Sequence, residues 1–346
     1  MKKFILIFIA VLGASFTAKA QDSFENILLA DSGDAQKLLQ AYFNPAMKGF
    51  IFGMSNGWYH TAKVHKKFGF DLSFGVSAGI APSKDEFFNI ATLGLTSITT
   101  SATEAPTFSG PDNTSVLMTV NTTIQGQAVN GSFNFPNGIK GRAPLGLNTL
   151  PVPFAQINLG LPFKIDGMLR VIPKASLGDN GNVDLLGFGL KKEITNWFGP
   201  LDKLPLHISL LAAYTKLNVE YGIDDSNSGD LLTNNALGTF SLTAFTVEAI
   251  GSLNFPFINI FGGFGYSKGT SDFKMSGTYT AVYDTGLPAP NDTVTRLLTP
   301  PNLTFNASGF KTTVGTRFSL GFLKIFGSYT MQEYNSINAG IAISIR

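Results

Sequence analysis

The sequence predicts an all-β protein, a transmembrane antiparallel up-and-down β-barrel of about 12 strands, with 14 as the alternative, preceded by a short N-terminal helix. Residues 68–80 alternate strictly between apolar and small or polar residues, which is typical of a strand with one apolar face. Strands of globular proteins average about 5–6 residues, whereas a tilted membrane-spanning strand needs about 9–11. The length of this stretch therefore indicates a bilayer.

The composition favours the same fold class. Charged residues make up 14% of the chain, which also contains 31 Phe, whereas soluble domains average about 25% charged residues. After the N-terminal segment no run of 18 apolar residues occurs, which excludes spanning helices. Alternating barrel strands produce this combination. The alternative is a large secreted β-sandwich, in which a second sheet would cover the apolar faces.

The first 20 residues have the pattern of a secretory signal peptide. Lys2 and Lys3 precede an apolar stretch, and Ala18-Lys19-Ala20 matches an A-x-A cleavage site. We therefore expect cleavage after Ala20 and export to the outer membrane of a Gram-negative bacterium. The expected organisation is a signal peptide over 1–20, a helical segment over 21–48 and a barrel over 49–346.

Charge and cysteine content exclude several function classes. Removing residues 1–20 takes away three Lys and no acid, so Lys+Arg falls from 25 to 22 against 23 Asp+Glu and the formal charge changes from +2 to −1. A nearly neutral mature chain gives no indication of nucleic-acid binding. With no Cys and only 3 His, disulfides and thiolate metal sites are excluded, and we predict no metal and no cofactor.

The segment before the barrel is predicted to be a short helix. Leu38, Leu39 and Tyr42 recur on one helical face, and Asn44-Pro45 is expected to end the helix. Such a helix either plugs the lumen or rests on the periplasmic rim. In the first hypothesis these five residues contact the ligand or form the plug.

Short connections alternate with long polar connections, which is how outer-membrane barrels distinguish periplasmic from extracellular ends. An even strand number is typical of single-chain bacterial barrels, and a further hairpin within 100–150 would raise the count to 14. The predicted strands are 50–60, 68–80, 88–99, 154–161, 164–173, 183–196, 205–221, 237–253, 257–275, 306–322, 325–333 and 336–346.

Two aromatic pairs are predicted to lie at the membrane interface. Trp58-Tyr59 falls near one end of a predicted strand and Trp197-Phe198 near a turn, positions typical of aromatic girdles. Core packing is the alternative for both pairs. Glycines within 75–79 and 187–189 would leave room for a ligand, a plug or a lateral opening.

Two resemblances to known families add to this interpretation. At Asn44-Pro45-Ala46 the chain resembles FadL-type outer-membrane transporters of long-chain fatty acids and hydrocarbons, which implies an N-terminal plug and a 14-strand barrel. Over most of its mature length the chain is similar to an uncharacterised family of Gram-negative outer-membrane proteins, which implies a barrel without assigning an activity. The shared blocks are NGWY at 56–59, TAK at 61–63, His65, GFDL at 69–72 and GFGLKKEI at 187–194.

An enzyme is the least favoured function. Outer-membrane phospholipases place His and Ser two residues apart on one strand with Asn-Gly following, and the chain resembles them only at His207 and Ser209. The two side chains would face the same way, but no Asn-Gly follows Ser209. We therefore predict no enzymatic activity and leave acyl hydrolysis as a distant third alternative.

The leading hypothesis is an outer-membrane barrel that binds or passes a small hydrophobic molecule. The alternative is a structural or adhesive barrel that transports nothing. The expected partners are outer-membrane lipid, a hydrophobic small molecule and the barrel-insertion machinery, without nucleic acid. A lumen that is small and apolar would favour transport, whereas a packed charged network would favour a sealed barrel.

Overall fold

The computed structural model describes residues 25–124, 126–140, 148–178, 180–226, 231–289 and 292–345. The predicted signal peptide and its cleavage site lie outside these residues. A short 3-10 helix, η1 (Glu25–Leu29), and one α-helix, α3 (Ser32–Met54), precede the strands. Among the described residues, no helix is both long enough and apolar enough to cross a membrane.

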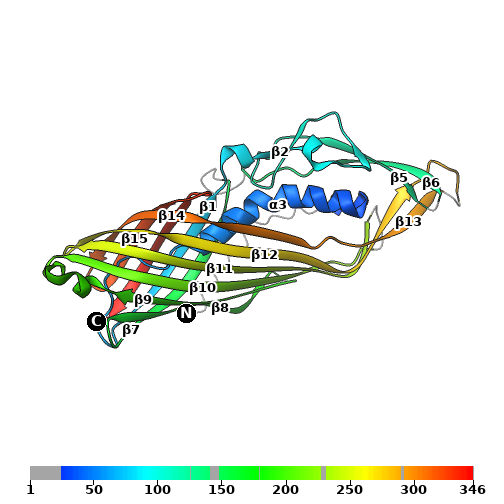
Figure 1. The fold of residues 1–346 in the computed structure, drawn as a ribbon. Helices are drawn as coiled ribbons and strands as arrows, with labels where there is room; N and C mark the ends of the chain where they lie inside the picture. Colours follow the sequence, from blue (N-terminus) through cyan, green and yellow to red (C-terminus); the bar gives the residue numbers. More distant parts are fainter. Residues whose placement is uncertain are drawn as a thin grey trace.

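The described strands form a closed antiparallel barrel of ten strands (Figure 1). Neighbours in the ring follow chain order, and pairing of the first with the last strand closes it, with Phe70 opposite Ile345. This confirms the predicted up-and-down β-barrel. The barrel strands are β1 (Phe70–Ile80), β7 (Thr149–Leu161), β8 (Ile165–Leu177), β9 (Gly181–Glu193), β10 (Leu206–Ile223), β11 (Leu231–Asn254), β12 (Ile258–Asp284), β14 (Leu303–Leu320), β15 (Leu323–Met331) and β16 (Ser336–Ile345).

The ring has two strands fewer than the 12 predicted. Residues 50–54 continue α3, and the chain then runs through the lumen. The segment 88–99 holds only short elements, and a hairpin does lie within 100–150 but pairs outside the ring. These elements are β2 (Phe87–Asn89), η3 (Ile90–Leu93), β3 (Ile98–Thr99), β4 (Glu104–Pro106), β5 (Leu117–Ile124) and β6 (Gln127–Asn134). A chain enclosed by a barrel is as apolar as a strand, so composition alone does not separate the two.

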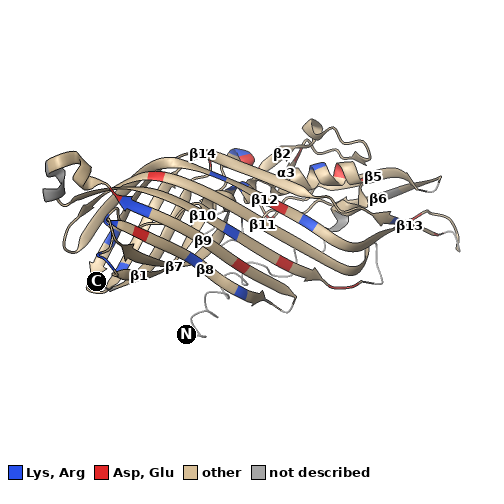
Figure 2. Cartoon of the chain, turned by 60° about the horizontal axis from the view of Figure 1, so that its bottom comes forward, with Lys and Arg blue, Asp and Glu red and all other residues tan. Residues whose placement is uncertain are grey.

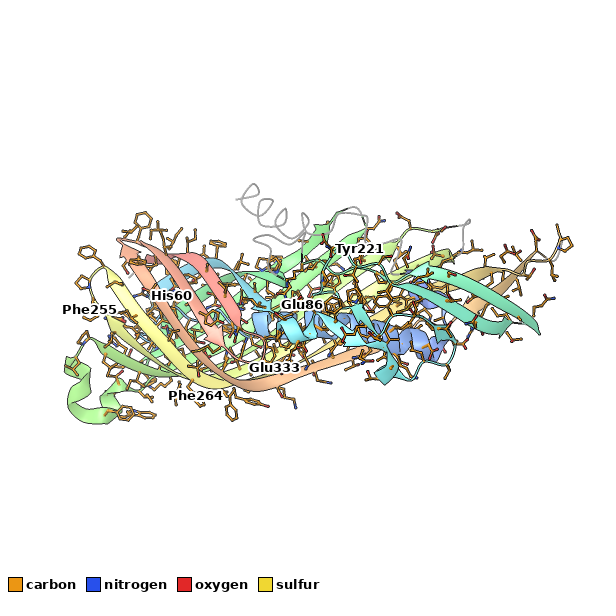
Figure 3. All side chains as sticks on the ribbon, turned by 90° about the horizontal axis from the view of Figure 1, so that it is seen from above. His60, Glu86, Tyr221, Phe255, Phe264 and Glu333 are labelled. Carbon is orange, nitrogen blue, oxygen red and sulfur yellow. The ribbon has the colours of Figure 1, made fainter. Side chains whose placement is uncertain are left out.

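The outer face of the barrel is apolar, as the period-2 pattern requires. In β9, for example, Leu185 faces the lumen and is 2% exposed, whereas Leu186 faces outward and is 44% exposed. Phe264 on β12 projects from the outer wall (Figure 3) and is 59% exposed. A wall whose outer face is apolar is suited to the hydrocarbon core of a bilayer.

The two ends of the barrel differ in the length of their connections. The turns β7–β8, β11–β12 and β14–β15 are short and lie at the same end as the C-terminus (Figure 1). At the other end β11 and β12 extend to 24 and 27 residues, and β13 (Thr293–Leu298) pairs with the outer part of β12. Residues 81–140, which contain β2 to β6, form a lobe over α3 at this long-loop end.

The helix α3 joins this lobe to the lumen. Its N-terminal half packs against Met118, Phe133 and Phe305, which belong to the lobe and to β14. It does not end at Asn44-Pro45, as predicted, but continues through the buried Pro45 to Met54. A proline inside a helix costs about 3 kcal/mol, and here packing on several sides of the helix offsets that cost.

Residues 49–65, hereafter the lumen segment, run through the barrel interior. Gly49 lies against Gly79 near the C-terminal end of β1, and Trp58 lies over Gly187 and Gly189 of β9. At the short-turn end His65 contacts Gly160. Of the glycines predicted to leave room for a plug or ligand, Gly79, Gly187 and Gly189 thus accommodate the chain's own lumen segment, whereas Gly75 lies against Phe154 of the wall.

The first turn of α3 is tied to the lobe by one carboxylate. The buried Asp34 accepts hydrogen bonds from the backbone N–H groups of Thr96 (2.8 Å) and Ser97 (2.6 Å) and from the Ser97 hydroxyl (2.8 Å). Burial by itself raises the pKa of Asp34, but the hydrogen bonds from Ser97 and Thr96 and the ammonium of Lys37 outweigh it and hold the pKa below its usual value.

We predict that acid releases this contact. A carboxyl whose pKa is lowered by folding stabilises the fold above its unfolded pKa of about 3.9 and loses that contribution as the pH falls through the lower, folded value. Hydrogen exchange of the Thr96 and Ser97 amides, corrected for intrinsic rates, should therefore show protection at neutral pH that decreases below about pH 4. Asp34→Asn should lower the protection at neutral pH about tenfold, whereas Glu104→Gln in the same lobe should leave it unchanged.

We also predict that Gly79 is required by the lumen segment. A Cβ at Gly79 would meet the backbone of Gly49, whereas a Cβ at Gly309 would meet nothing within 4 Å. Gly79→Ala should therefore destabilise the barrel by about 1–3 kcal/mol, because neither backbone can move away. Gly309→Ala should be neutral. The temperature at which the folded barrel loses its compact migration in gel electrophoresis measures both, and equal temperatures for the two variants would contradict the prediction.

Candidate functional site

An apolar cavity of about 270 Å³ lies between α3 and the inner wall of the barrel. Every residue that lines it is apolar, including Phe50 and Met54 of α3, Leu185 of β9 and Leu217 of β10. An apolar cavity of about 150 Å³ stays dry and takes up a molecule the size of benzene. The space beside α3 is therefore suited to a somewhat larger apolar molecule.

The barrel wall beside this cavity is incompletely paired. β7 and β8 share only six residue pairs, from Gln156 with Arg170 to Leu161 with Ile165. Toward the long-loop end, residues 149–155 of β7 pair with β1 alone, and residues 171–172 and 175–177 of β8 pair with β9 alone. We call this stretch the β7–β8 seam.

Prolines occupy the seam on both sides. Pro151 and Pro153 lie in the part of β7 that β8 does not pair, and both line the cavity. Pro173 lies on β8 at a register shift between Ile172 and Ala175. Proline has no N–H group to donate to a ladder, so it is confined to edges and bulges. The local sequence therefore disfavours closure of the wall beside the cavity.

A buried guanidinium lies in the lumen next to the cavity. Arg170 on β8 is fully buried, and its guanidinium carbon lies 4.2 Å from the ring centroid of Trp58 and 4.5 Å from that of Phe154. It donates hydrogen bonds to the Gln156 side chain and to the Asn56 carbonyl oxygen. Stacking between two rings together with these hydrogen bonds compensates the removal of the charge from water.

A second cation binds the lumen segment from the opposite wall. Lys311 on β14 is 3.0 Å from a carboxylate oxygen of Glu248 on β11 and donates to the Ser55 carbonyl oxygen at 3.1 Å and to the Asn56 side chain at 3.0 Å. Arg170 and Lys311 thus hold the same residues of the lumen segment from two sides.

The histidines continue this network toward the short-turn end. Both ring nitrogens of His65 face carboxylates, Nδ1 at 3.1 Å from Asp166 and Nε2 at 3.1 Å from Asp71. His60 contacts Asp71 through Nε2 at 3.2 Å, and Lys191 contacts Asp166 at 2.9 Å. The lower lumen is therefore a packed ionic layer.

Among the described residues, no group of three or more His, Cys, Asp or Glu side chains could hold a metal ion.

The two residues of the hydrolase alternative, His207 and Ser209, are bound to other groups of the lumen. Ser209 is fully buried, and its hydroxyl donates to the Ala62 carbonyl oxygen at 2.6 Å. His207 instead contacts Glu193, with its Nδ1 3.0 Å from the carboxylate. The lumen segment therefore lies over the serine that acyl hydrolysis would need to expose.

The predicted plug residues lie outside the part of the lumen that is filled. Leu38, Leu39 and Tyr42 are buried against the lobe and the long strands, and the Tyr42 hydroxyl donates to the Asn137 carbonyl oxygen at 2.8 Å. Asn44 is half-buried, and Pro45 is buried within α3.

The predicted interface aromatics divide into two groups. Trp58 and Tyr59, which are 2% and 8% exposed, pack inside the lumen against strand glycines rather than at the membrane interface. Their assignment to the interface was wrong because the stretch that carries them is not a wall strand. Trp197 and Phe198 are 65% and 50% exposed in η5 (Thr195–Lys203), at the short-turn end. Their interface role stays a prediction.

The charged lumen residues were not predicted individually, although the sequence carries a signal for them. Asp71, Arg170, Lys191, Glu248 and Lys311 each occupy the inward parity of a barrel strand and are nearly fully buried. A charged side chain in a membrane strand avoids the lipid face at the bilayer centre. An ionisable residue in the middle of a predicted span thus marks the lumen side.

Comparisons with known proteins give the family and no activity. Over residues 1–345 the chain matches the "Family of unknown function (DUF6588)". The chain belongs to this family. No curated protein matches the sequence.

Solved structures that resemble the chain are barrels of outer membranes. The translocator domain of the autotransporter NalP from Neisseria meningitidis has 11% identity and a TM-score of 0.32, with 86% of this chain and 93% of that chain covered. Ail, the attachment invasion locus protein of Yersinia pestis, has 8% identity and a TM-score of 0.27, with 81% and 100% covered. Since both TM-scores are below 0.5, the fold assignment rests on the strand pairing described above.

We predict that removing the Arg170 side chain makes the barrel leak ions. Arg170→Ala leaves a void where the guanidinium lies between Trp58 and Phe154 and removes the hydrogen bonds that hold the lumen segment. Single-channel conductance in planar bilayers should be low for the wild-type protein and several-fold higher for the variant. Lys174→Ala, at an exposed position of the same strand, should behave like the wild type. Equal conductance of both variants would contradict the role of Arg170 as a seal.

Proposed function

We propose that this family member is an outer-membrane barrel that binds a small apolar molecule in the cavity beside α3 and exchanges it with the bilayer through the β7–β8 seam. The observation that carries the proposal is that an all-apolar cavity lies beside the β7–β8 ladder, which is the shortest ladder among the described barrel pairings. Pro151 and Pro153 belong to both features.

A lateral route fits the lumen better than an axial one. Below the cavity an apolar molecule would have to separate Arg170 from Trp58 and break the Lys311–Glu248 pair. Separating buried charges from their partners costs several kcal/mol, and an apolar molecule offers no replacement hydrogen bonds. At the seam, by contrast, the molecule meets apolar side chains and an interrupted ladder.

The same proposal includes the cellular setting predicted above. The chain would be exported with cleavage after Ala20, inserted by the barrel-insertion machinery and surrounded by outer-membrane lipid. It would carry no enzymatic activity, which the burial of Ser209 supports. Nucleic acid is not among the proposed partners.

A sealed barrel that transports nothing is the second candidate, and the ionic layer of the lumen favours it. Arg170, Lys311 and His65 are bound as in a structural core. In that case the lobe and the long strand ends would be the functional surface. The two candidates differ in whether the cavity beside α3 takes up a molecule.

A matched pair of substitutions tests the proposed function. Leu185 and Leu186 are adjacent in β9, but Leu185 lines the cavity and Leu186 faces outward. Leu185→Trp should reduce binding of an apolar probe such as a medium-chain alkane at least tenfold, because the indole occupies space that the probe needs. Leu186→Trp should leave binding unchanged. Native mass spectrometry of the protein purified from outer membranes, with and without added alkane, measures both.

Two results would contradict the proposal. Wild-type protein that retains no apolar species and takes up no alkane would favour the sealed barrel. Alkane binding that is equal in both tryptophan variants would place the bound probe on the outer wall rather than in the cavity.

A further inference from the structure

The apolar cavity beside α3 is lined unevenly, with its aromatic side chains gathered on one side. Phe makes up 31 of the 346 residues of the chain but 6 of the 16 described residues that line the cavity. These phenylalanines come from α3, the lobe, β11, β12 and β14, and we call them the phenylalanine wall. They are Phe43, Phe50, Phe108, Phe240, Phe273 and Phe305.

The side of the cavity at the β7–β8 seam is aliphatic. The strands β7, β8, β9 and β10 contribute only Pro, Val, Ile and Leu to the described lining. These four strands are neighbours in the ring, and β11, β12 and β14 follow one another after β10. A molecule that enters through the seam therefore passes aliphatic side chains before it meets the phenylalanine wall.

The rings of the phenylalanine wall already contact one another and still have surface for a further partner. The ring centroids of Phe50 and Phe240 are 5.7 Å apart, and that of Phe43 is 5.7 Å from Phe108 and 6.2 Å from Phe273. Favourable ring–ring contacts have centroids about 4.5–7 Å apart. All five of these side chains are only half-buried, so a bound ring would extend an existing aromatic cluster.

The volume of the cavity sets the size of the ligand. A cavity of about 150 Å³ holds one benzene molecule, and the cavity beside α3 has about 270 Å³. Two fused rings share an edge and therefore need less than twice the space of benzene. The cavity is thus suited to a molecule of one or two rings.

The lining offers nothing to a charged head group. Charged residues are sparse along the ribbon (Figure 2), and none is among the described residues that line the cavity. Arg170 donates to the carbonyl oxygen of Met54, which lines the cavity, but its guanidinium is also bound to Gln156 and to the Asn56 carbonyl oxygen. A carboxylate in the cavity would lose its hydration without gaining a hydrogen bond from the lining.

We propose that the ligand of this cavity is an aromatic hydrocarbon of one or two rings, and that the phenylalanine wall selects it over saturated hydrocarbons of the same shape. This inference rests on the proposed function of the cavity and names the class of its ligand. Aromatic rings attract one another in edge-to-face and offset arrangements, which a saturated ring does not form. Each such contact raises affinity about two- to tenfold beyond the effect of the buried area.

Uptake of a matched pair of hydrocarbons tests the selection. Ethylbenzene and ethylcyclohexane differ in ring saturation and little in size, and both are volatile. The purified protein in a non-ionic detergent is equilibrated with both vapours, and headspace gas chromatography measures how much of each it removes. Uptake that Leu185→Trp eliminates is uptake by the cavity. Relative to partition into hexadecane, the wild-type cavity should prefer ethylbenzene about tenfold.

Matched substitutions locate the preference within the cavity. Phe50→Leu/Phe240→Leu removes one ring pair of the phenylalanine wall but keeps the lining apolar, and it should lower the preference to about threefold or less. Phe264→Leu, on the outer wall of β12 (Figure 3), should keep the full preference. Phe273→Leu removes a lining ring of β12 and should also lower the preference, which keeps the test valid if the double variant folds poorly.

The possible results distinguish this inference from the proposed function. Equal normalised uptake of the two hydrocarbons by the wild-type protein would overturn the aromatic selection and leave the cavity as a binding site for apolar molecules. A preference that both phenylalanine-wall variants retain in full would do the same. Wild-type uptake of either compound no greater than that of Leu185→Trp would overturn the proposed function together with this inference.

Discussion

The packing of the lumen segment against the inner wall is the contact on which the rest of the structure depends. Gly187 and Gly189 are covered by Trp58, and the cations of Arg170 and Lys311 find their hydrogen-bond acceptors on residues 54–56. Without these partners the wall would expose buried charges that cost several kcal/mol each. The barrel and its N-terminal segment are thus one folding unit, in which each supplies what the other needs to be buried.

This arrangement divides the interior into two levels of different polarity. Beside α3 the lining is wholly apolar, whereas the lumen around His65, Arg170 and Lys311 is filled by buried charged groups. The β7–β8 ladder stops beside the apolar cavity. Under the proposed function, a molecule that dissolves in lipid would meet its most compatible surface from the side of the barrel.

The sequence predictions failed where a stretch is apolar because the barrel encloses it rather than because it faces lipid. The stretch that contains Trp58 and Tyr59 is apolar and aromatic because the barrel surrounds it, and composition does not distinguish that environment from lipid. Pro45 predicted a helix end because an isolated helix would stop there, but packing against the lobe and the long strands carries α3 on to Met54. Removing the two misassigned stretches, 50–60 and 88–99, from the predicted list leaves the ten strands of the ring.

The sequence by itself determined the class of fold and the course of each wall strand, because period-2 alternation is a local property that the pleat translates directly into two faces. It also contained the information that Arg170 and Lys311 face the lumen, since charged side chains avoid the lipid face of a membrane strand. Only the tertiary structure decided which residues fill the lumen, that Asp71 and Asp166 meet at His65, and that the β7–β8 ladder stops beside an apolar cavity. The contacts of the lumen segment with Asp166 and Arg170 join residues about 100 or more positions apart, and no local pattern specifies which distant partner a side chain will find.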